Sequence, residues 1–149
     1  MKEKRHCINC GTVLVLRHKI KYCSNKCQIK NNYKIWIESW KIGNNNGSVG
    51  LSSGGISRHL RKFLIEKFGS KCAICGWNKK HPLTNTVPLE IDHIDGNAEN
   101  NLENNLRLIC PNCHALTPFF RNLNRGRGRK WRTEKYSTDL HRPINKRNN

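Results

Sequence analysis

The hydrophobic positions of the chain fall into short patterned stretches separated by long polar runs. In residues 25–41, Ile29, Tyr33, Ile37 and Trp40 recur at close to the helical period. Residues 58–68 carry a second stripe of this kind, between a Ser that can cap a helix start and a Gly that can end a helix. This stripe and its two boundary residues are Leu60, Phe63, Leu64, Phe68, Ser57 and Gly69. The two patterns predict helices at 25–41 and 58–68.

Strand-like patterns lie in the second half of the chain. Apolar runs at 89–94 and 106–109 flank a polar loop, and Asp95-Gly96 is a turn signal. They predict two short strands forming a hairpin, after which His114 is expected to open a helix. In the N-terminal part, residues 13–16 and 19–22 could form a further hairpin before the first helix.

Residues 43–56 separate the two patterned halves. They contain five glycines and six Asn or Ser among fourteen residues, a composition that favours a linker or loop. We therefore expect four parts, which are a zinc finger at 1–42, a linker at 43–56, a domain at 57–123 and a basic tail at 124–149. Short modules of this size usually need a metal or a disulfide to stabilise a small core.

Eight cysteines form four close pairs, and each pair has a gap of two or three residues. Such gaps let two thiolates bind one tetrahedral zinc ion. The predicted zinc ligands are Cys7, Cys10, Cys23 and Cys27 in the first site and Cys72, Cys75, Cys110 and Cys113 in the second. Disulfides are the alternative, but no signal peptide precedes the first pair, so an intracellular, reducing compartment is expected.

The net charge changes the set of expected partners. It is +18, from 28 basic and 10 acidic residues, and a positive field of this size favours polyanions. No long apolar run and no basic helix with a broad apolar face is present, so nucleic acid is favoured over a membrane.

Basic side chains gather in two places. The polar face of the helix at 58–68 carries Arg58, Arg61 and Lys62, which form either a solvated face or phosphate contacts. From residue 121 onward, basic residues dominate and two glycines disfavour a helix, which indicates a tail along a DNA backbone or groove, with a solubilising tail as the alternative. The candidate contacts there are Arg121, Arg125, Arg127, Arg129, Lys130 and Arg132.

The interval between the last two cysteine pairs is specific. It holds Asp92-His93-Ile94, then Asn104-Asn105-Leu106-Arg107, then Cys110-Pro111-Asn112-Cys113-His114. Together these motifs resemble the HNH nuclease family, in its zinc-containing branch with the ββα-metal fold, and small free-standing phage homing endonucleases in particular. The resemblance implies a small α+β, treble-clef-like domain stapled by zinc, preceded here by the four-cysteine finger.

The resemblance also implies roles for single residues. His93 matches the general base, since a neutral imidazole can accept a proton from water at pH 7. Asp92 and His114 match the ligands of a catalytic divalent cation. Asn105 matches the middle Asn, which would tie the loop to the hairpin and orient His93, and Asn104 is an alternative for that task. Neighbouring residues of a strand point to opposite faces. Asp92 should therefore point to a metal between the hairpin and the helix, and His93 should face the scissile phosphate from the other side.

One position departs from the family pattern. Colicin-type members carry a further metal-binding His four residues after the last motif His, where this chain has Pro118. With two protein ligands, the metal keeps open positions, which favours Mg²⁺, or Mn²⁺ in vitro, over a tightly held catalytic zinc. The expected cofactors are thus two structural zinc ions and one catalytic Mg²⁺ or Mn²⁺.

The sequence therefore predicts a phosphodiester hydrolase acting on double-stranded DNA, more readily as a monomer than as a dimer, in the cytoplasm of a bacterial host if a phage encodes it. Two rivals remain. A structure-selective junction or packaging nuclease would share the same site residues. A non-catalytic zinc-finger regulator would share the charge and the cysteines, but it leaves Asp92, His93 and His114 together unexplained.

Overall fold

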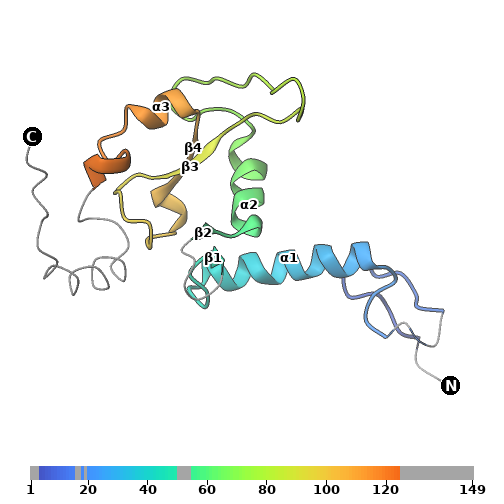
Figure 1. Ribbon diagram of the computed structural model, residues 1–149. Helices are drawn as coiled ribbons and strands as arrows, with labels where there is room; N and C mark the ends of the chain where they lie inside the picture. The colour runs from blue at the N-terminus through green and yellow to red at the C-terminus, as the bar shows by residue number, and fades with distance from the viewer. Residues whose placement is uncertain (1–3, 16–17, 19, 50–54, 125–149) are drawn as a thin grey trace, which may run out of the picture. The chain divides into compact units, whose positions relative to one another are not determined.

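The structure is a computed structural model that describes residues 4–15, 18, 20–49 and 55–124. The chain divides into two compact units, Met1–Asn45 and Asn46–Asn149. Figure 1 shows the order of the elements along the chain. Within the described residues, no helix is both long enough and apolar enough to cross a membrane.

The first unit consists of a cysteine-rich loop region followed by one long helix. The helix, α1, covers Asn25–Lys41, as its hydrophobic spacing predicts. Ser24 caps its start, because the Ser24 hydroxyl accepts a hydrogen bond from the backbone N–H of Cys27 at 3.2 Å. Ile37 and Trp40 are the buried residues of α1. Of the hairpin predicted from residues 13–16 and 19–22, the described residues form no strand pair, and Val13 instead pairs with His6 as an isolated bridge. Residues 16, 17 and 19 lie outside the described residues.

The second unit begins with a short antiparallel pair, β1 (Ser48–Val49) and β2 (Gly55–Ile56). Both strands lie within residues 43–56, whose composition predicted a linker. Strand pairing joins residues 48–49 of this stretch to residues 55–56. The helix α2 (Arg58–Phe68) follows, between the Ser57 cap and Gly69, as predicted. Ser57 accepts from the backbone N–H of Leu60 at 3.1 Å, and Gly69 has a φ of 78°, which favours glycine.

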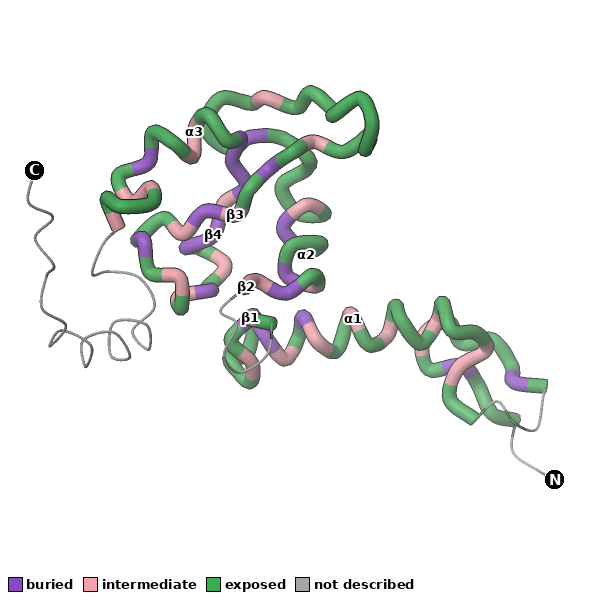
Figure 2. The backbone as a smooth tube through the Cα atoms, in the orientation of Figure 1, coloured by how far each residue is buried: buried purple, intermediate pink, exposed green. Residues whose placement is uncertain are grey.

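The predicted hairpin is β3 (Glu90–His93) paired antiparallel with β4 (Leu106–Ile109). A short 3₁₀ helix, η1 (Glu103–Asn105), leads into β4, and η2 (Arg121–Asn124) is the last described element. Helix α2 packs on β4, and α3 (Pro111–Ala115) packs on β3. Figure 2 shows that buried positions of this unit follow α2, β3 and β4, and the fully buried side chains there are Leu60, Leu64, Leu108 and Ile109.

One boundary differs from the prediction. The helix expected to open at His114 begins at Pro111, so His114 lies near its end. The cause is local, because Cys110 caps the helix by accepting from the backbone N–H of Cys113 at 3.4 Å. Proline also fits the first helical position, where its missing N–H would have no partner in any case.

Candidate active site

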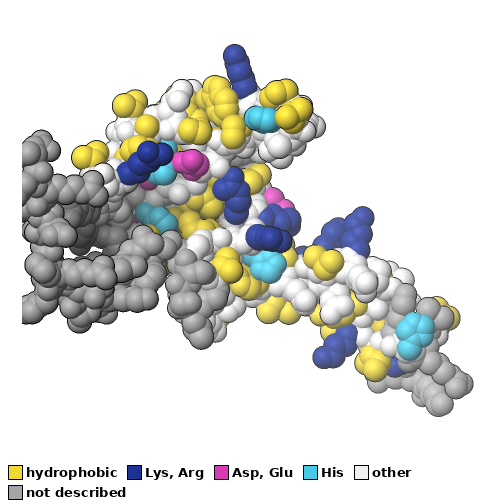
Figure 3. All heavy atoms as spheres, viewed as in Figure 1, with side chains coloured by type: hydrophobic (Ala, Val, Ile, Leu, Met, Phe, Trp, Pro, Cys, Tyr) yellow, Lys and Arg dark blue, Asp and Glu magenta, His cyan; other side chains and the backbone are white. Residues whose placement is uncertain are grey.

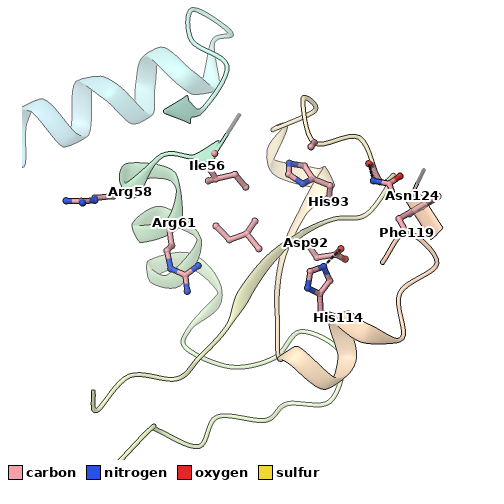
Figure 4. Close-up of a pocket in the computed structure, with 12 residues that line it drawn as sticks. Ile56, Arg58, Arg61, Asp92, His93, His114, Phe119 and Asn124 are labelled. Carbon is pink, nitrogen blue, oxygen red and sulfur yellow. Dashed lines mark hydrogen bonds and ion pairs between the residues drawn. The ribbon is translucent and has the colours of Figure 1, made fainter. Parts of the chain in front are cut away.

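A cleft of about 470 Å³ lies between α2, the β3–β4 hairpin and the segment after α3. Figure 4 shows Arg58 and Arg61 on α2, at one side of the cleft, and His93, Asp92 and His114 at the other, with the Arg58 side chain extending away from His93. In the surface view, Lys and Arg side chains are visible over α2 (Figure 3). The lining residues used below are Arg58, Arg61, Asp92, His93, Gly96, His114 and Phe119.

Asp92 and His114, the two predicted metal ligands, come together in this cleft. The Oδ1 atom of Asp92 lies 3.8 Å from Nε2 of His114. Asp92 belongs to β3 and is buried, with 6% of its surface exposed, while His114 comes from α3, which packs on that strand. Adjacent donors on one octahedral Mg²⁺ lie about 3 Å apart, so this carboxylate and imidazole could share one cation after approaching each other by less than about 1 Å.

Two neighbours hold these two side chains in place. The Nε atom of Arg107 donates to Oδ2 of Asp92 at 2.7 Å, which leaves Oδ1 of the same carboxylate directed at His114. Glu90 contacts His114 through its Oε2 atom, at the Nδ1 atom of the ring. The carboxylate therefore orients the imidazole with its other nitrogen toward Asp92, as carboxylates behind metal-binding histidines commonly do.

His93 lies next to Asp92 on β3 but has different partners, as the alternation of a strand predicts. Its Nε2 atom lies 2.8 Å from Oδ1 of Asn101. Asn101 in turn donates from Nδ2 to the backbone carbonyl of Asn46 at 2.7 Å and to the Ser48 hydroxyl at 3.1 Å. Asn101 is thus the hydrogen-bond partner of the His93 ring, through its side-chain oxygen.

Asn105 holds the loop between β3 and β4. Its Nδ2 atom donates to Oδ1 of Asp95 and to the Asn100 carbonyl, both at 2.8 Å, and its Oδ1 accepts from the Asp95 backbone N–H at 3.0 Å. These bonds join the loop to the hairpin, the first task expected of Asn105. The Asn105 amide is directed at the Asp95 turn, and the side-chain partner of the His93 ring is Asn101, so any influence of Asn105 on His93 would pass through the loop. Asn104, the alternative, is exposed.

The same loop stabilises a charged carboxylate. Burial would raise the pKa of Asp95, but hydrogen bonds from the side chain of Asn100, the backbone N–H of Asn97 and the side chain of Asn105 outweigh it, and a protonated His93 would lower it further. The pKa of Asp95 is therefore lowered, and the turn is anchored by an ionised side chain at neutral pH.

Gly96 brings the turn close to the segment after α3. Its φ is 74°, and a Cβ atom added there would lie 2.5 Å from Cγ of Phe119. Its carbonyl accepts from Nδ2 of Asn124 at 2.8 Å. Only a residue without a side chain permits both the backbone conformation and this contact.

Four cysteines gather where the loop before β3 meets the start of α3. The ligand sulfurs of Cys72, Cys75, Cys110 and Cys113 all lie within 4.8 Å of one another, and those of Cys75 and Cys110 are 3.8 Å apart. Sulfurs bound 2.3 Å from one tetrahedral zinc are about 3.8 Å apart, so the cluster has the donors and close to the spacing that a zinc ion requires.

Two thiols of this cluster, those of Cys72 and Cys113, have pKa values shifted in opposite directions. Burial would raise the pKa of Cys72, but backbone N–H groups of Cys75, Cys110 and Ile74 lower it to about 6. For Cys113, the hydrogen bond with the Cys75 side chain is the largest cause that raises the pKa, to about 12. Neighbouring thiolates repel one another, so full deprotonation of such a cluster requires a cation, which is what zinc supplies.

The first unit repeats this arrangement with Cys7, Cys10, Cys23 and Cys27, whose sulfurs also lie within 4.8 Å of one another. The sulfurs of Cys10 and Cys23 are 3.6 Å apart, and those of Cys23 and Cys27 are 3.4 Å apart. Both predicted four-cysteine groups are therefore assembled, and both have the donor set and spacing of structural zinc sites.

The predicted DNA contacts divide into three groups. Arg58 and Arg61 line the cleft, and Nη2 of Arg61 donates to the Leu89 carbonyl at 2.5 Å. Lys62 and Arg121 do not line the cleft. Lys62 forms an ion pair with Glu66 at 2.8 Å. Arg121 lies over the Phe120 ring, with its Cζ atom 5.0 Å from the ring centroid. The others lie outside the described residues, and they are Arg125, Arg127, Arg129, Lys130 and Arg132.

Comparison with known proteins agrees with this site. Residues 72–116 match the family model of the HNH endonuclease. Over 100 residues the chain is 51% identical to the H-N-H endonuclease F-TflIV of Escherichia phage T5, an alignment that covers 67% of this chain and 40% of that protein. The match thus spans about two fifths of the length of this relative. No solved structure matches the chain. The resemblance that the motifs indicate is confirmed, and residues 72–116 form an HNH endonuclease domain.

Sequence reasoning missed three residues that act on the site, namely Glu90, Asn101 and Arg107. Two of them could have been found from the predicted strands. Glu90 lies two positions before Asp92 on β3, on the same face, and Arg107 pairs with Asp92 in the hairpin register. Asn101 lies in an irregular loop rich in Asn, where spacing does not show which amide reaches His93.

Proposed function

We propose that this chain is a metal-dependent endonuclease of the HNH type that cuts double-stranded DNA in the manner of phage homing endonucleases. The observation that carries the proposal is the placement of Asp92, His114 and His93 in one cleft, with Oδ1 of Asp92 and Nε2 of His114 3.8 Å apart. The similarity to a phage protein named as an H-N-H endonuclease supports the same activity.

Each cleft residue has a task in this hydrolysis. His93 takes a proton from a water molecule, and the resulting hydroxide attacks the phosphorus, after which the bond to the leaving oxygen breaks. A divalent cation held by Asp92 and His114, Mg²⁺ or Mn²⁺, would supply charge neutralisation on the phosphoryl and leaving oxygens. Arg58 and Arg61 bind DNA phosphates from the α2 side of the cleft and hold the strand against His93.

Two structural zinc ions would hold the frame. In the second unit, zinc on the four cysteines joins the loop before β3 to the start of α3, and so it fixes the helix that supplies His114. We further propose that the basic residues after Asn124 add sequence-independent affinity for DNA, that the chain acts as a monomer, and that it acts in the cytoplasm of a bacterial host.

The test is cleavage of supercoiled plasmid by the full chain, with Mg²⁺ and with a chelator. His93→Ala is expected to lower the rate by about 10²–10⁴, the usual cost of losing a general base, with DNA binding unchanged. His18→Ala is the control, because His18 is exposed and lies in the first unit. Binding without cleavage at any metal concentration would favour the non-catalytic regulator and overturn the proposal.

A further inference from the structure

Asn101 connects the proposed general base to the segment that precedes α2. Its side chain lies between His93 and residues 46–48, and only 6% of its surface is exposed. Within the second unit, this amide joins two parts of the chain that are about fifty residues apart, since the bond to Asn46 spans 55 positions. A buried amide with partners on both sides is fixed in one orientation.

The partners of Asn101 determine which end of its amide faces His93. The backbone carbonyl of Asn46 can only accept a hydrogen bond, so the group 2.7 Å from it must be the NH₂ of Asn101. The same NH₂ also donates to the Ser48 hydroxyl. The carbonyl oxygen of Asn101 therefore faces Nε2 of His93 at 2.8 Å. Since that oxygen can only accept, Nε2 must carry the proton of the neutral imidazole.

We infer that Asn101 is a positioning residue that holds His93 in the Nε2–H tautomer and makes Nδ1 the atom that accepts the proton from water. This inference rests on the proposed function of His93. When Nδ1 takes the proton, the water becomes hydroxide and attacks the phosphorus, and the ring becomes an imidazolium that still donates from Nε2 to Asn101. The Asn101 oxygen then stabilises the positive charge that forms on the ring.

The inference gives residues 46–48 a part in the site. Asn46 accepts, through Oδ1, from the backbone N–H of Ser48 at 3.0 Å, and the Gly47 carbonyl accepts from the backbone N–H of Ser57 at 2.9 Å. Ser57 is the cap of α2. Residues 46–48 are thus held to the start of α2. The position of this segment affects Asn101 through the hydrogen bond between the Asn101 amide and the Asn46 carbonyl. Composition alone predicted only a linker for this stretch.

Three substitutions separate a positioning role from a purely structural one. Asn101→Leu has similar volume but removes both the acceptor for His93 and the donor to Asn46. Asn101→Asp also loses that donor but keeps an acceptor for Nε2–H. Asn104→Ala is the control, because Asn104 lies in the same loop and is exposed. Both Asn101 variants should be less stable than the wild type, so stability alone does not distinguish the two roles.

The experiment is long-range ¹⁵N–¹H NMR of the His93 ring in the zinc-loaded full chain without Mg²⁺, together with steady-state plasmid cleavage. The wild type, Asn101→Asp and Asn104→Ala are expected to show the Nε2–H tautomer. Asn101→Leu is expected to show a mixture with Nδ1–H, and a kcat lowered roughly 10–100-fold with KM for DNA unchanged, as for other groups that orient a reacting residue.

An Nδ1–H tautomer in the wild type would overturn the inference, and so would an unchanged tautomer in Asn101→Leu. If Asn101→Leu does not fold, the wild-type and Asn101→Asp spectra still decide the tautomer. Absence of cleavage with every metal, combined with the Nε2–H tautomer in the wild type, would remove the proposed function while leaving the Asn101–His93 arrangement established.

Discussion

Glu90 and His114 contact each other across β3 and α3, with Oε2 of the carboxylate at Nδ1 of the imidazole. This contact assigns the proton of His114 to Nδ1 and turns Nε2 toward Asp92. Asp92 is held in the same way from its other side by Arg107. The two proposed ligands of the catalytic cation therefore each have one oriented donor atom and one atom bound to a neighbouring charged side chain.

Replacing Glu90 tests whether this orientation matters for the metal. Glu90→Gln keeps the size of the side chain and removes the charge, so the proton on Nδ1 and the direction of the ring are less well fixed. We expect the affinity for Mn²⁺ to fall by roughly 10–100-fold, with zinc content unchanged. Electron paramagnetic resonance titration of free Mn²⁺ measures this directly without DNA.

Glu66→Gln is the matched control, because Glu66 is also a glutamate in a surface ion pair, with Lys62, but does not line the cleft. Its Mn²⁺ affinity should equal that of the wild type. Equal affinities in all three proteins would show that Glu90 does not orient a metal ligand.

The two cysteine clusters predict a metal content and a folding dependence. Elemental analysis should find two zinc ions per chain, and Cys72→Ser should lose one of them. Because Cys72 is 2% exposed and its cluster anchors the start of α3, this variant should also lose the folded HNH domain, since zinc binding is much of the folding energy of such modules. Amide NMR spectra of the two proteins check the folding.

Cys7→Ser is the parallel variant in the first unit. It should also contain one zinc ion, but the resonances of residues 72–116 should remain dispersed, because its cluster belongs to the other compact unit. A Cys72→Ser protein that lacks one zinc and still keeps a folded domain would contradict the structural role of that zinc.

The helices α1 and α2 and the β3–β4 hairpin could be predicted because each carries its own local signal. The stripe in α2 lies between Ser57 and Gly69, and both boundary residues act as predicted. The hairpin follows from two apolar runs around a turn, and the cysteine spacing fixes the metal clusters. Signals of this kind depend on near neighbours, which the sequence shows directly.

The hydrogen bonds of the asparagines around His93 could not be predicted in the same way. The bond between Asn101 and Asn46 joins positions 55 residues apart, and no periodicity relates them. Several Asn residues in the loop at 97–105 have the same chemistry, so the choice of Asn101 for His93 and of Asn105 for Asp95 depends on the folded loop. The start of α3 was missed because a cysteine acts as its cap, a task that sequence reasoning assigns to Ser, Thr, Asp or Asn.

Gly96 provides a test of packing in the loop that carries the active site. Gly96→Ala would strain a backbone with a φ of 74° and would place a methyl group against the Phe119 ring. Gly69→Ala has the same kind of backbone strain, with a φ of 78°, but no atom within 4 Å of its added Cβ. We expect Gly96→Ala to lower the free energy of unfolding by about 1–3 kcal/mol more than Gly69→Ala.

Urea unfolding of both variants measures the difference. Phe119→Leu combined with Gly96→Ala should recover part of the loss, because the clash is with the aromatic ring. Equal stability losses in the two glycine variants would mean that the ring moves away at no cost, and that the contact between the turn and Phe119 does not constrain the site.

The order in which plasmid products appear tests the number of active sites. Among the described residues, the Asp-His pair with a following His occurs in the second unit alone, as Asp92, His93 and His114. The first unit repeats the cysteine cluster, but it has no Asp-His pair between its cysteine pairs, and Gln28 occupies the position that corresponds to His114. The first unit therefore cannot cut DNA by the proposed mechanism.

One active site attacks one strand before it must be repositioned. A monomer should thus convert supercoiled plasmid to open circle first, and linear DNA should accumulate only after open circle has formed. A symmetric dimer would place two clefts on the DNA and could cut both strands in one encounter. Quenched-flow sampling at enzyme concentrations below that of the plasmid distinguishes these cases. The sedimentation coefficient of the chain, measured at the same concentration, gives its oligomeric state. Linear product that appears without a preceding open-circle phase would rule out nicking by a monomer, because a single copy of His93 cannot act on two strands at once.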